Sequence, residues 1–463
     1  MRIRTMLTFA AAVLATTAAL AQQPPKETPP APGTPKNFSI PPISKMTLPN
    51  GLKVRFVPYG SVPKASVRLV LQTGNVDEAA NETWLADLTG EMIQQGTATR
   101  SAEDIARQVA LMGGSLDVNV GMNQTNIGTD VFSESVTDAI ALIGDVARNP
   151  KFPAAELDRL KGDLARNLAI QRSQPQPLAQ EKFASVTFPN HAYGRYFPTN
   201  EMLGGYTLDQ VRGFYDRNFG AARAAIYVVG VFDQAAAERA IRTALGDWKA
   251  GNPATTVSLS PTSRRSIYLI DRPGSVQSTV IVGLPSITPA SNDYVPFVVT
   301  NSLLGGSFGS RITSNIREQK GYTYSPSSAI NARLGAGTWA ETADVTTNVT
   351  GPSIKEIIGE IERLRNEPPT AAELQGIQNY LAGSFVLRNS SRAGIVNQLA
   401  FLDLYGLTED YLRTYVQRIY ATTPADLQRM AQSYIDPSKL TIVIAGDASK
   451  IREQITPYGE IVP

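Results

Sequence analysis

The single histidine and the lack of cysteine set the first limits on what chemistry this 463-residue chain can perform. Disulfides, zinc fingers, iron–sulfur clusters and thiol nucleophiles all require cysteine sulfur. A metal site with two or three histidines needs more than His191 provides. A serine nucleophile would also have to use His191 as its general base. A zinc enzyme therefore cannot be completed with histidine and cysteine ligands from this chain alone.

The N-terminus has the pattern of a secretory signal. Arg2 and Arg4 precede an apolar stretch over residues 7–20, which ends in Ala-Leu-Ala. We expect cleavage after Ala21, because the stretch is shorter than the roughly 20 apolar residues of a membrane span. The mature chain then has 41 basic and 41 acidic residues. We expect a periplasmic protein with no membrane span after signal cleavage, and without the basic field that nucleic-acid binding requires.

Strands and helices are mixed along the mature chain. Alternating apolar residues at 52–57 and 66–71 predict strands, and helical spacing at 101–112 and 155–170 predicts helices. The predicted class is α+β.

An internal repeat divides the chain. Ala-Ala-Glu-Leu at residues 154–157 recurs 217 residues later, and residues 207–230 align without gaps with residues 423–446 at an offset of 216. Two offsets that agree within one residue indicate two related domains of about 200 residues each. The predicted boundaries are a signal peptide at 1–21, a proline-rich disordered leader at 22–45, an N-terminal domain at 46–249, a linker at 250–265 and a C-terminal domain at 266–463.

Three motifs in the second domain resemble a known family. Residues 303–311 read Leu-Leu-Gly-Gly-Ser-Phe-Gly-Ser-Arg, and residues 316–325 contain I-R-E-x-K-G-x-x-Y-S. Both resemble elements of the pitrilysin and insulinase-type zinc peptidases, the inverzincins, and residues 272–278 resemble the strand that opens the same domain. The resemblance covers nearly all of the mature chain. It implies two homologous α/β-sandwich domains that form a clamshell, each with a mixed, largely antiparallel sheet and packed helices.

The first domain of active members contains H-x-x-E-H on a helix, where two histidines bind zinc and the glutamate acts as general base. Counting back from Gly96 in the kept flanking pattern places this window on Asp87-Leu88-Thr89-Gly90-Glu91. The degenerate zinc-site positions that the resemblance implies are Asp87 and Glu91 for the histidines, Gly90 for the base, and Asn167 for the third ligand. We expect no metal in this chain.

Asp87 and Glu91 keep the i and i+4 spacing of the two histidines, which leaves binding of a calcium or magnesium ion as an alternative. Such cations prefer six or more oxygens, and no dense acidic loop or neighbouring carboxylate cluster accompanies the pair. A solvated or helix-lining acidic pair is favoured, with Gly90 costing the helix about 1 kcal/mol relative to alanine.

The C-terminal domain keeps Arg317 and Tyr324 at the spacing of the family's substrate-binding pair. The resemblance implies that both hydrogen-bond peptide carbonyls near the scissile bond. A forked, permanent charge and a phenol suit a carbonyl oxygen whose negative charge grows in the transition state. The structural alternative is an ion pair of Arg317 with Glu318 and a sheet position for Tyr324. Tyr322 is the substitute if the register differs.

His191 lies in a segment that resembles the family's "H-P-Y-G-R" loop, at residues 189–195. The loop is structural in that family. We therefore expect His191 to pack or hydrogen-bond rather than catalyse.

Loss of the zinc residues with retention of Arg317 and Tyr324 resembles the non-zinc subunits of bacterial two-subunit members. Our first hypothesis is a substrate-binding subunit of a periplasmic heteromeric zinc metalloendopeptidase, which is not a self-sufficient peptidase. Zinc is then expected in a homologous partner subunit, and extended peptides are the expected substrates, bound in part as an added strand on the partner's sheet. The alternative is a catalytically inert scaffold or peptide-binding module, and a self-sufficient peptidase with an unfamiliar mechanism also remains open.

Overall fold

The computed structural model describes residues 39–254 and 259–462, and the chain from Asn37 onward forms one compact unit. The predicted signal peptide and the leader up to residue 38 lie outside the described residues. Strand β1 begins at Ser44, where it pairs with Phe56 of the next strand, so regular structure starts two residues before the predicted start of the N-terminal domain at residue 46.

The N-terminal half contains one six-stranded sheet and its helices. Its elements are β1 (Ser44–Thr47), β2 (Lys53–Pro58), β3 (Lys64–Leu71), η1 (Asn75–Asp77), α2 (Leu85–Ile93), α3 (Ala102–Leu111), β4 (Asp117–Val120), β5 (Thr125–Phe132), η2 (Ser133–Ser135), α4 (Val136–Arg148), α5 (Ala154–Ser173), α6 (Pro175–Thr187), η3 (Ala192–Gly194), α7 (Asn200–Gly205), α8 (Leu208–Asn218), η4 (Ala221–Arg223), β6 (Ala224–Gly230) and α9 (Gln234–Leu245).

The C-terminal half contains a second six-stranded sheet. Its elements are β7 (Ser266–Asp271), β8 (Gln277–Ser286), α10 (Tyr294–Asn301), η5 (Ser302–Gly306), η6 (Thr313–Gln319), β9 (Ser327–Ala332), β10 (Gly337–Thr346), η7 (Thr347–Val349), α11 (Thr350–Asn366), α12 (Ala371–Arg388), α13 (Arg392–Tyr405), α14 (Asp410–Ala421), α15 (Pro424–Tyr434), η8 (Pro437–Lys439), β11 (Thr441–Gly446), α16 (Ala448–Ile455), η9 (Thr456–Tyr458) and β12 (Glu460–Val462).

The two sheets repeat one topology. Strands run in the order β1-β2-β6-β3-β5-β4 in the first sheet and β12-β7-β11-β8-β10-β9 in the second. Five consecutive strands agree in order and direction, because β2 with β6 and β7 with β11 are parallel while the pairs that follow are antiparallel. The predicted fold class, two α/β domains with mixed sheets, is confirmed.

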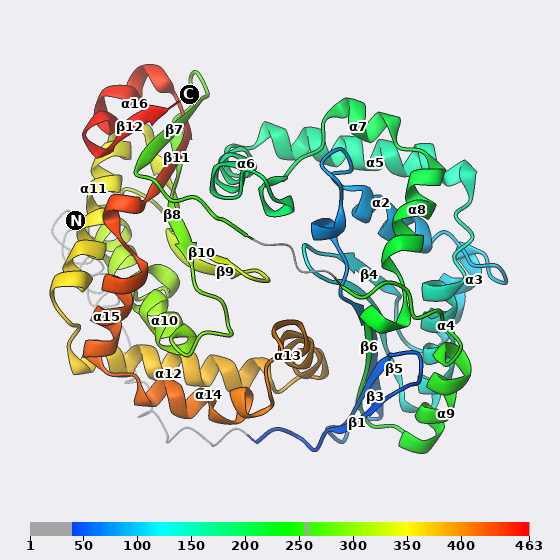
Figure 1. The fold of residues 1–463 in the computed structure, drawn as a ribbon. Helices are drawn as coiled ribbons and strands as arrows, with labels where there is room; N and C mark the ends of the chain where they lie inside the picture. The colour runs from blue at the N-terminus through cyan, green and yellow to red at the C-terminus, as the bar shows by residue number, and fades with distance from the viewer. Residues whose placement is uncertain (1–38, 255–258, 463) are drawn as a thin grey trace, which may run out of the picture. The chain divides into compact units, whose positions relative to one another are not determined.

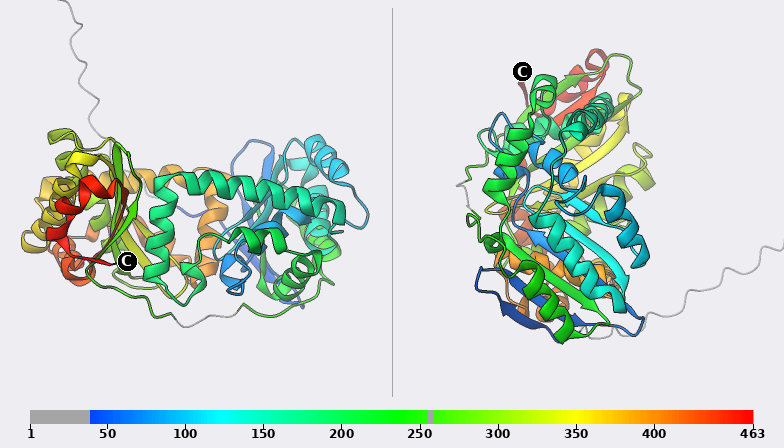
Figure 2. Two further views of the ribbon diagram at one scale, coloured as in Figure 1. Left: turned by 90° about the horizontal axis from the view of Figure 1, so that it is seen from above. Right: turned by 90° about the vertical axis from the view of Figure 1, so that its right-hand side faces the viewer.

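Each sheet is covered on one face by helices of its own half and on the other by a helix from the opposite half (Figures 1 and 2). Helix α13 packs on β6 and β3, and its Leu399 joins Tyr227 of β6 in one apolar cluster. Helix α6 packs on β8 and β11, where Phe183 meets Ile281. Strand β6 is buried along its whole length, which explains its unbroken apolar sequence.

Within residues 39–254 and 259–462, no helix is both long enough and apolar enough to cross a membrane.

Candidate functional site

Only two of the four degenerate zinc positions share a cavity. Asp87 of α2 and Asn167 of α5 line a space of about 260 Å³, together with Trp84 and Arg195 from the adjoining loops. Gly90 is buried elsewhere on α2, and Glu91 is exposed to solvent. The resemblance implied one site for all four positions, whereas the lining of this cavity includes Asp87 and Asn167 without Gly90 or Glu91.

The position of the family's general base is occupied by another side chain. A Cβ on Gly90 would lie 2.5 Å from Cγ2 of Val120 on β4. This distance is too short for two carbon atoms, so any side chain at residue 90 must displace the strand or its valine. The base is therefore lost from the sequence, and Val120 fills the room it would need.

Replacing Gly90 with alanine is expected to lower the free energy of unfolding by about 1–3 kcal/mol. The clash with Val120 outweighs the gain in helix propensity of about 1 kcal/mol. Urea unfolding of Gly90→Ala with and without Val120→Ala provides the measurement. The second substitution should remove most of the penalty, and an equal penalty in both backgrounds would contradict the packing argument.

Hydrogen bonds within the chain occupy the carboxylates of the 260 Å³ cavity. The Asn75 side-chain amide donates to Asp87 Oδ2 at 2.6 Å and to Glu78 Oε1 at 3.1 Å. Glu78 Oε1 also accepts the backbone N–H of Ala86 at 2.9 Å, in the first turn of α2. Burial raises the pKa of Glu78 to about 8, and burial also raises the pKa of Asp87.

Zinc does not fit these residues. Among residues 39–254 and 259–462, no three histidine, cysteine, aspartate or glutamate side chains are grouped closely enough to hold a metal ion. The two acids of the cavity bind an amide and a helix end, and Asn167 accepts a hydrogen bond from Gln171 at 3.0 Å. No metal-dependent step is assigned to this chain.

Replacing Glu78 with glutamine should stabilise the protein increasingly as the pH rises from about 4.5 to about 8. The folded state favours the neutral carboxyl, so its contribution is complete below pH 4.5 and is lost as the pH approaches 8. Glutamine stays neutral and keeps an acceptor for Ala86. We expect melting curves that nearly coincide at pH 4.5, while at pH 8 the variant is more stable by several kcal/mol, because a change of one in pKa corresponds to about 1.4 kcal/mol. A difference independent of pH would contradict this assignment.

The C-terminal half contains a second cavity, of about 340 Å³, that includes the predicted substrate-binding pair. Its lining comes from the turn at residues 305–308, from η6, from the start of β9 and from α12. The aromatic and charged side chains of this lining are Phe308, Arg317, Tyr324 and Tyr380.

Arg317 contacts two aromatic rings. Its guanidinium lies 4.3 Å from the ring centre of Phe308 and 5.1 Å from that of Tyr324. Nε pairs with Glu318 at 3.2 Å, as the structural alternative predicted. Within the described part of the chain the two terminal nitrogens have no hydrogen-bond or ion-pair partner. They are free to donate to a ligand carbonyl.

Tyr324 and Tyr322 face different surroundings. Tyr324 is 80% exposed, whereas Tyr322 packs against the core of the C-terminal half. The backbone N–H of Tyr322 donates to Ile316 O at 2.8 Å, which ends η6 and turns the chain. Neither residue lies in a named strand, so the sheet position that the structural alternative gave to Tyr324 is not found. The exposed phenol beside Arg317 is that of Tyr324.

Serine chemistry is not supported by the segment at residues 305–309, although it has G-x-S-x-G spacing. In serine hydrolases this pattern lies between a strand and a helix, whereas here it follows α10 and η5. Ser307 Oγ is buried without a hydrogen-bond partner among the described residues. Nδ1 of His191 accepts the backbone N–H of Tyr193 at 3.1 Å, and the two rings are 4.3 Å apart. These contacts give His191 a structural role.

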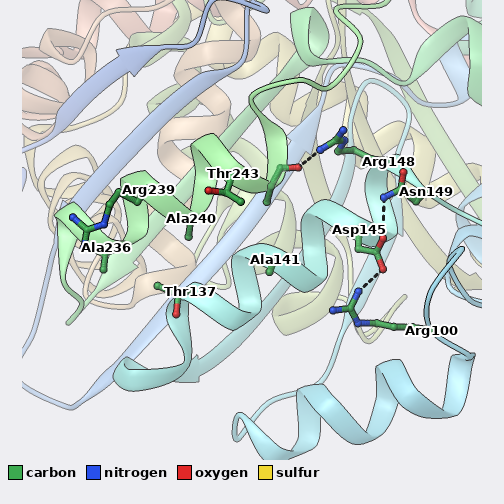
Figure 3. A pocket seen from close by; sticks show the side chains of 11 residues that line it. Arg100, Thr137, Ala141, Asp145, Arg148, Asn149, Ala236, Arg239, Ala240 and Thr243 are labelled. Carbon is green, nitrogen blue, oxygen red and sulfur yellow. Dashed lines mark hydrogen bonds and ion pairs between the residues drawn. The ribbon is translucent and has the colours of Figure 1, made fainter.

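A third cavity, of about 580 Å³, lies between α4 and α9 and contains none of the predicted site residues (Figure 3). Two of its arginines are paired locally, Arg100 with Asp145 and Arg148 with Asp247. We assign no function to it.

Several cavity residues were not found from the sequence. Phe308 stood within the quoted glycine-rich stretch, and an aromatic residue among glycines was the available signal. Tyr380, Glu78 and Trp84 had no such signal, because only the tertiary fold brings them to the cavities.

Comparison with known proteins agrees with the motifs. Residues 59–197 match the family model described as insulinase (peptidase family M16), and residues 205–381 match the model described as peptidase M16 inactive domain. An uncharacterized zinc protease of Streptomyces coelicolor is 22% identical over 85% of this chain and 87% of its own length. Another, of Mycobacterium leprae, is 22% identical over 88% and 93%.

Solved structures show the same fold. A peptidase M16 inactive domain from Pseudomonas fluorescens superposes with a TM-score of 0.82 at 24% identity, covering 88% of this chain and 98% of that one. A protease from Helicobacter pylori gives 0.83 at 17% identity, covering 88% and 100%.

Proposed function

Because this chain belongs to the insulinase family of peptidases, family M16, we propose that it is the non-zinc, substrate-binding subunit of a heteromeric zinc metalloendopeptidase. The proposal depends mainly on one contrast. The cavity of the N-terminal half has no metal-binding group among the described residues, whereas the cavity of the C-terminal half presents Arg317 with unpaired donors beside Tyr324.

In this function Arg317 and Tyr324 bind the backbone of an extended peptide. The terminal nitrogens of Arg317 donate to a carbonyl oxygen, while the rings of Phe308 and Tyr324 lie close to the guanidinium. Tyr324 donates a second hydrogen bond from its exposed phenol. Both bonds strengthen as negative charge develops on the carbonyl oxygen. A homologous partner subunit would supply the zinc that activates water.

The signal-like N-terminus supports a periplasmic location for this complex. A heterodimer is its simplest composition, since one chain of each type completes one composite site.

Mixing experiments test the proposal. The mature chain and a zinc-bearing homologue encoded by the same organism are assayed separately and together on fluorogenic peptides. We expect hydrolysis that neither chain shows alone and that saturates near equal amounts. Activity of the zinc-bearing chain that is unchanged by addition would reject the proposal.

The ion pair of Arg317 with Glu318 favours a second function, a catalytically inert scaffold or peptide-binding module. In that case Glu318 balances the charge of Arg317 in the absence of substrate. Peptide binding without any gain in hydrolysis would identify this alternative.

A further inference from the structure

A carboxylic acid is buried directly behind the wall of the Arg317 cavity. Glu341 lies in the middle of β10, opposite Val282 of β8 and Ser328 of β9, and its side chain is fully buried. Neither carboxyl oxygen has a hydrogen-bond partner among the described residues. An unsatisfied buried carboxyl is costly, so its retention calls for an explanation.

The carboxyl group lies against the glycine-rich turn. A Cβ on Gly305 would be 2.3 Å from Glu341 Oε2 and 2.6 Å from Ser328 Oγ. Gly305 and Gly306 also line the cavity that contains Arg317 and Tyr324. A single residue without a side chain therefore separates the acid from the cavity.

Neighbouring polar groups leave Glu341 without a partner because they satisfy one another. Asn301 Oδ1 accepts hydrogen bonds from Trp339 Nε1 and Ser328 Oγ, both at 2.8 Å. Gly306 rests against the same amide, since a Cβ there would lie 2.4 Å from Asn301 Nδ2. The turn is thus packed on two side chains: Asn301, which is hydrogen-bonded, and Glu341, which is not.

The surroundings of Glu341 contain almost no charge. Strands β8 and β9 and the turn η5 have no titratable side chain, and α10 has only Tyr294. The charged residues of α11 do not act on the carboxyl either. Burial raises the pKa of Glu341 well above its usual range. The dipole of the nearby Ser327 backbone N–H lowers this pKa by a smaller amount. The neutral acid is therefore the form that packs here.

We propose that Glu341 is a positioning residue for the peptide cavity: the glycine-rich turn keeps its place beside Arg317 only while this carboxyl stays packed against Gly305 and Ser328. A charged carboxylate cannot remain without a partner in this core. Since Gly305 lies between the carboxyl and the cavity, ionisation displaces the turn and removes one wall of the cavity. The link to peptide binding rests on the proposed function, whereas the behaviour of the turn does not.

Hydrogen exchange of the full mature chain tests the turn itself. Exchange of residues 302–309 is compared between the wild type, Glu341→Gln and Glu341→Met at equal pH, so that the intrinsic rate cancels. We expect equal protection at pH 6 and at least tenfold faster exchange in the wild type between pH 9 and 10. Residues 224–230 of β6 report on global unfolding. Glu78→Gln is the control for Glu78, the other buried acid that has a raised pKa. If the ratio of the wild-type exchange rate to the variant exchange rate is the same at every pH, the inference is overturned.

Binding of fluorescein-labelled unfolded casein connects the turn to the cavity. The wild type should lose at least tenfold in affinity between pH 6 and pH 9.5, and Glu341→Gln less than twofold. Opening of the turn with equal loss of casein affinity in both proteins overturns the link to the cavity. Opening of the turn without casein binding at any pH supports the positioning role and rejects the peptide-binding function instead.

Discussion

Replacing Arg317 with alanine is expected to lower the turnover of the peptidase, formed by mixing this chain with a zinc-bearing partner, by about 10²–10³-fold. This is the usual effect of removing one donor to a developing oxyanion. The terminal nitrogens of Arg317 have no partner among the described residues, and the guanidinium lies over the rings of Phe308 and Tyr324. Steady-state kinetics on a fluorogenic peptide, with this chain saturating, measures the effect. Most of the loss should appear in kcat rather than in KM, because the bonds strengthen in the transition state.

Glu318→Gln is the matched control for this experiment. It removes the ion pair at Nε but leaves the terminal nitrogens of Arg317 in place. Its turnover should stay within about threefold of the wild type. If Arg317→Ala leaves the kinetics unchanged, the composite site is rejected and the scaffold function is favoured.

Replacing Asp77 with alanine is expected to lower the free energy of unfolding by about 3–5 kcal/mol, the cost of leaving a buried cation without its partner. Asp77 pairs with Arg223 at 2.9 Å, and the two side chains are only 10% and 5% exposed. Arg223 also donates to the carbonyls of Gln72, Asn252 and Pro253, so one guanidinium joins the end of β3 to the chain after α9.

Denaturant unfolding followed by circular dichroism measures this loss. Asp209→Ala is the control, because the Asp209–Arg212 pair is long, at 3.8 Å, and its aspartate is 95% exposed. The control should be indistinguishable from the wild type. Equal midpoints for Asp77→Ala and the wild type would show that the buried pair does not stabilise the fold.

Local sequence patterns predicted the repeated architecture well. The offsets of 216 and 217 residues matched α5 with α12 and β6 with β11, because a duplicated chain keeps its apolar periodicity. The family resemblance grouped Asp87 with Asn167, and both line one cavity. It also placed Arg317 near Tyr324, since only a short turn separates them.

Tertiary contacts account for what the sequence did not reveal. Nothing local indicates that Val120 fills the space beside Gly90, or that Glu341 lies behind Gly305. These contacts join residues that are distant in the chain, and a single sequence does not indicate which distant residues pair. Nor does anything local indicate that α6 covers the sheet of the other half.

The exchange of helices between the halves affects how the chain can be divided. Each sheet needs α6 or α13 from the opposite half to cover its second face. Two fragments cut within residues 250–265 would each expose an apolar sheet and carry a helix without its docking surface. Such fragments should be insoluble alone and reassemble when expressed together, so the duplicated halves have become obligate complements rather than independent domains.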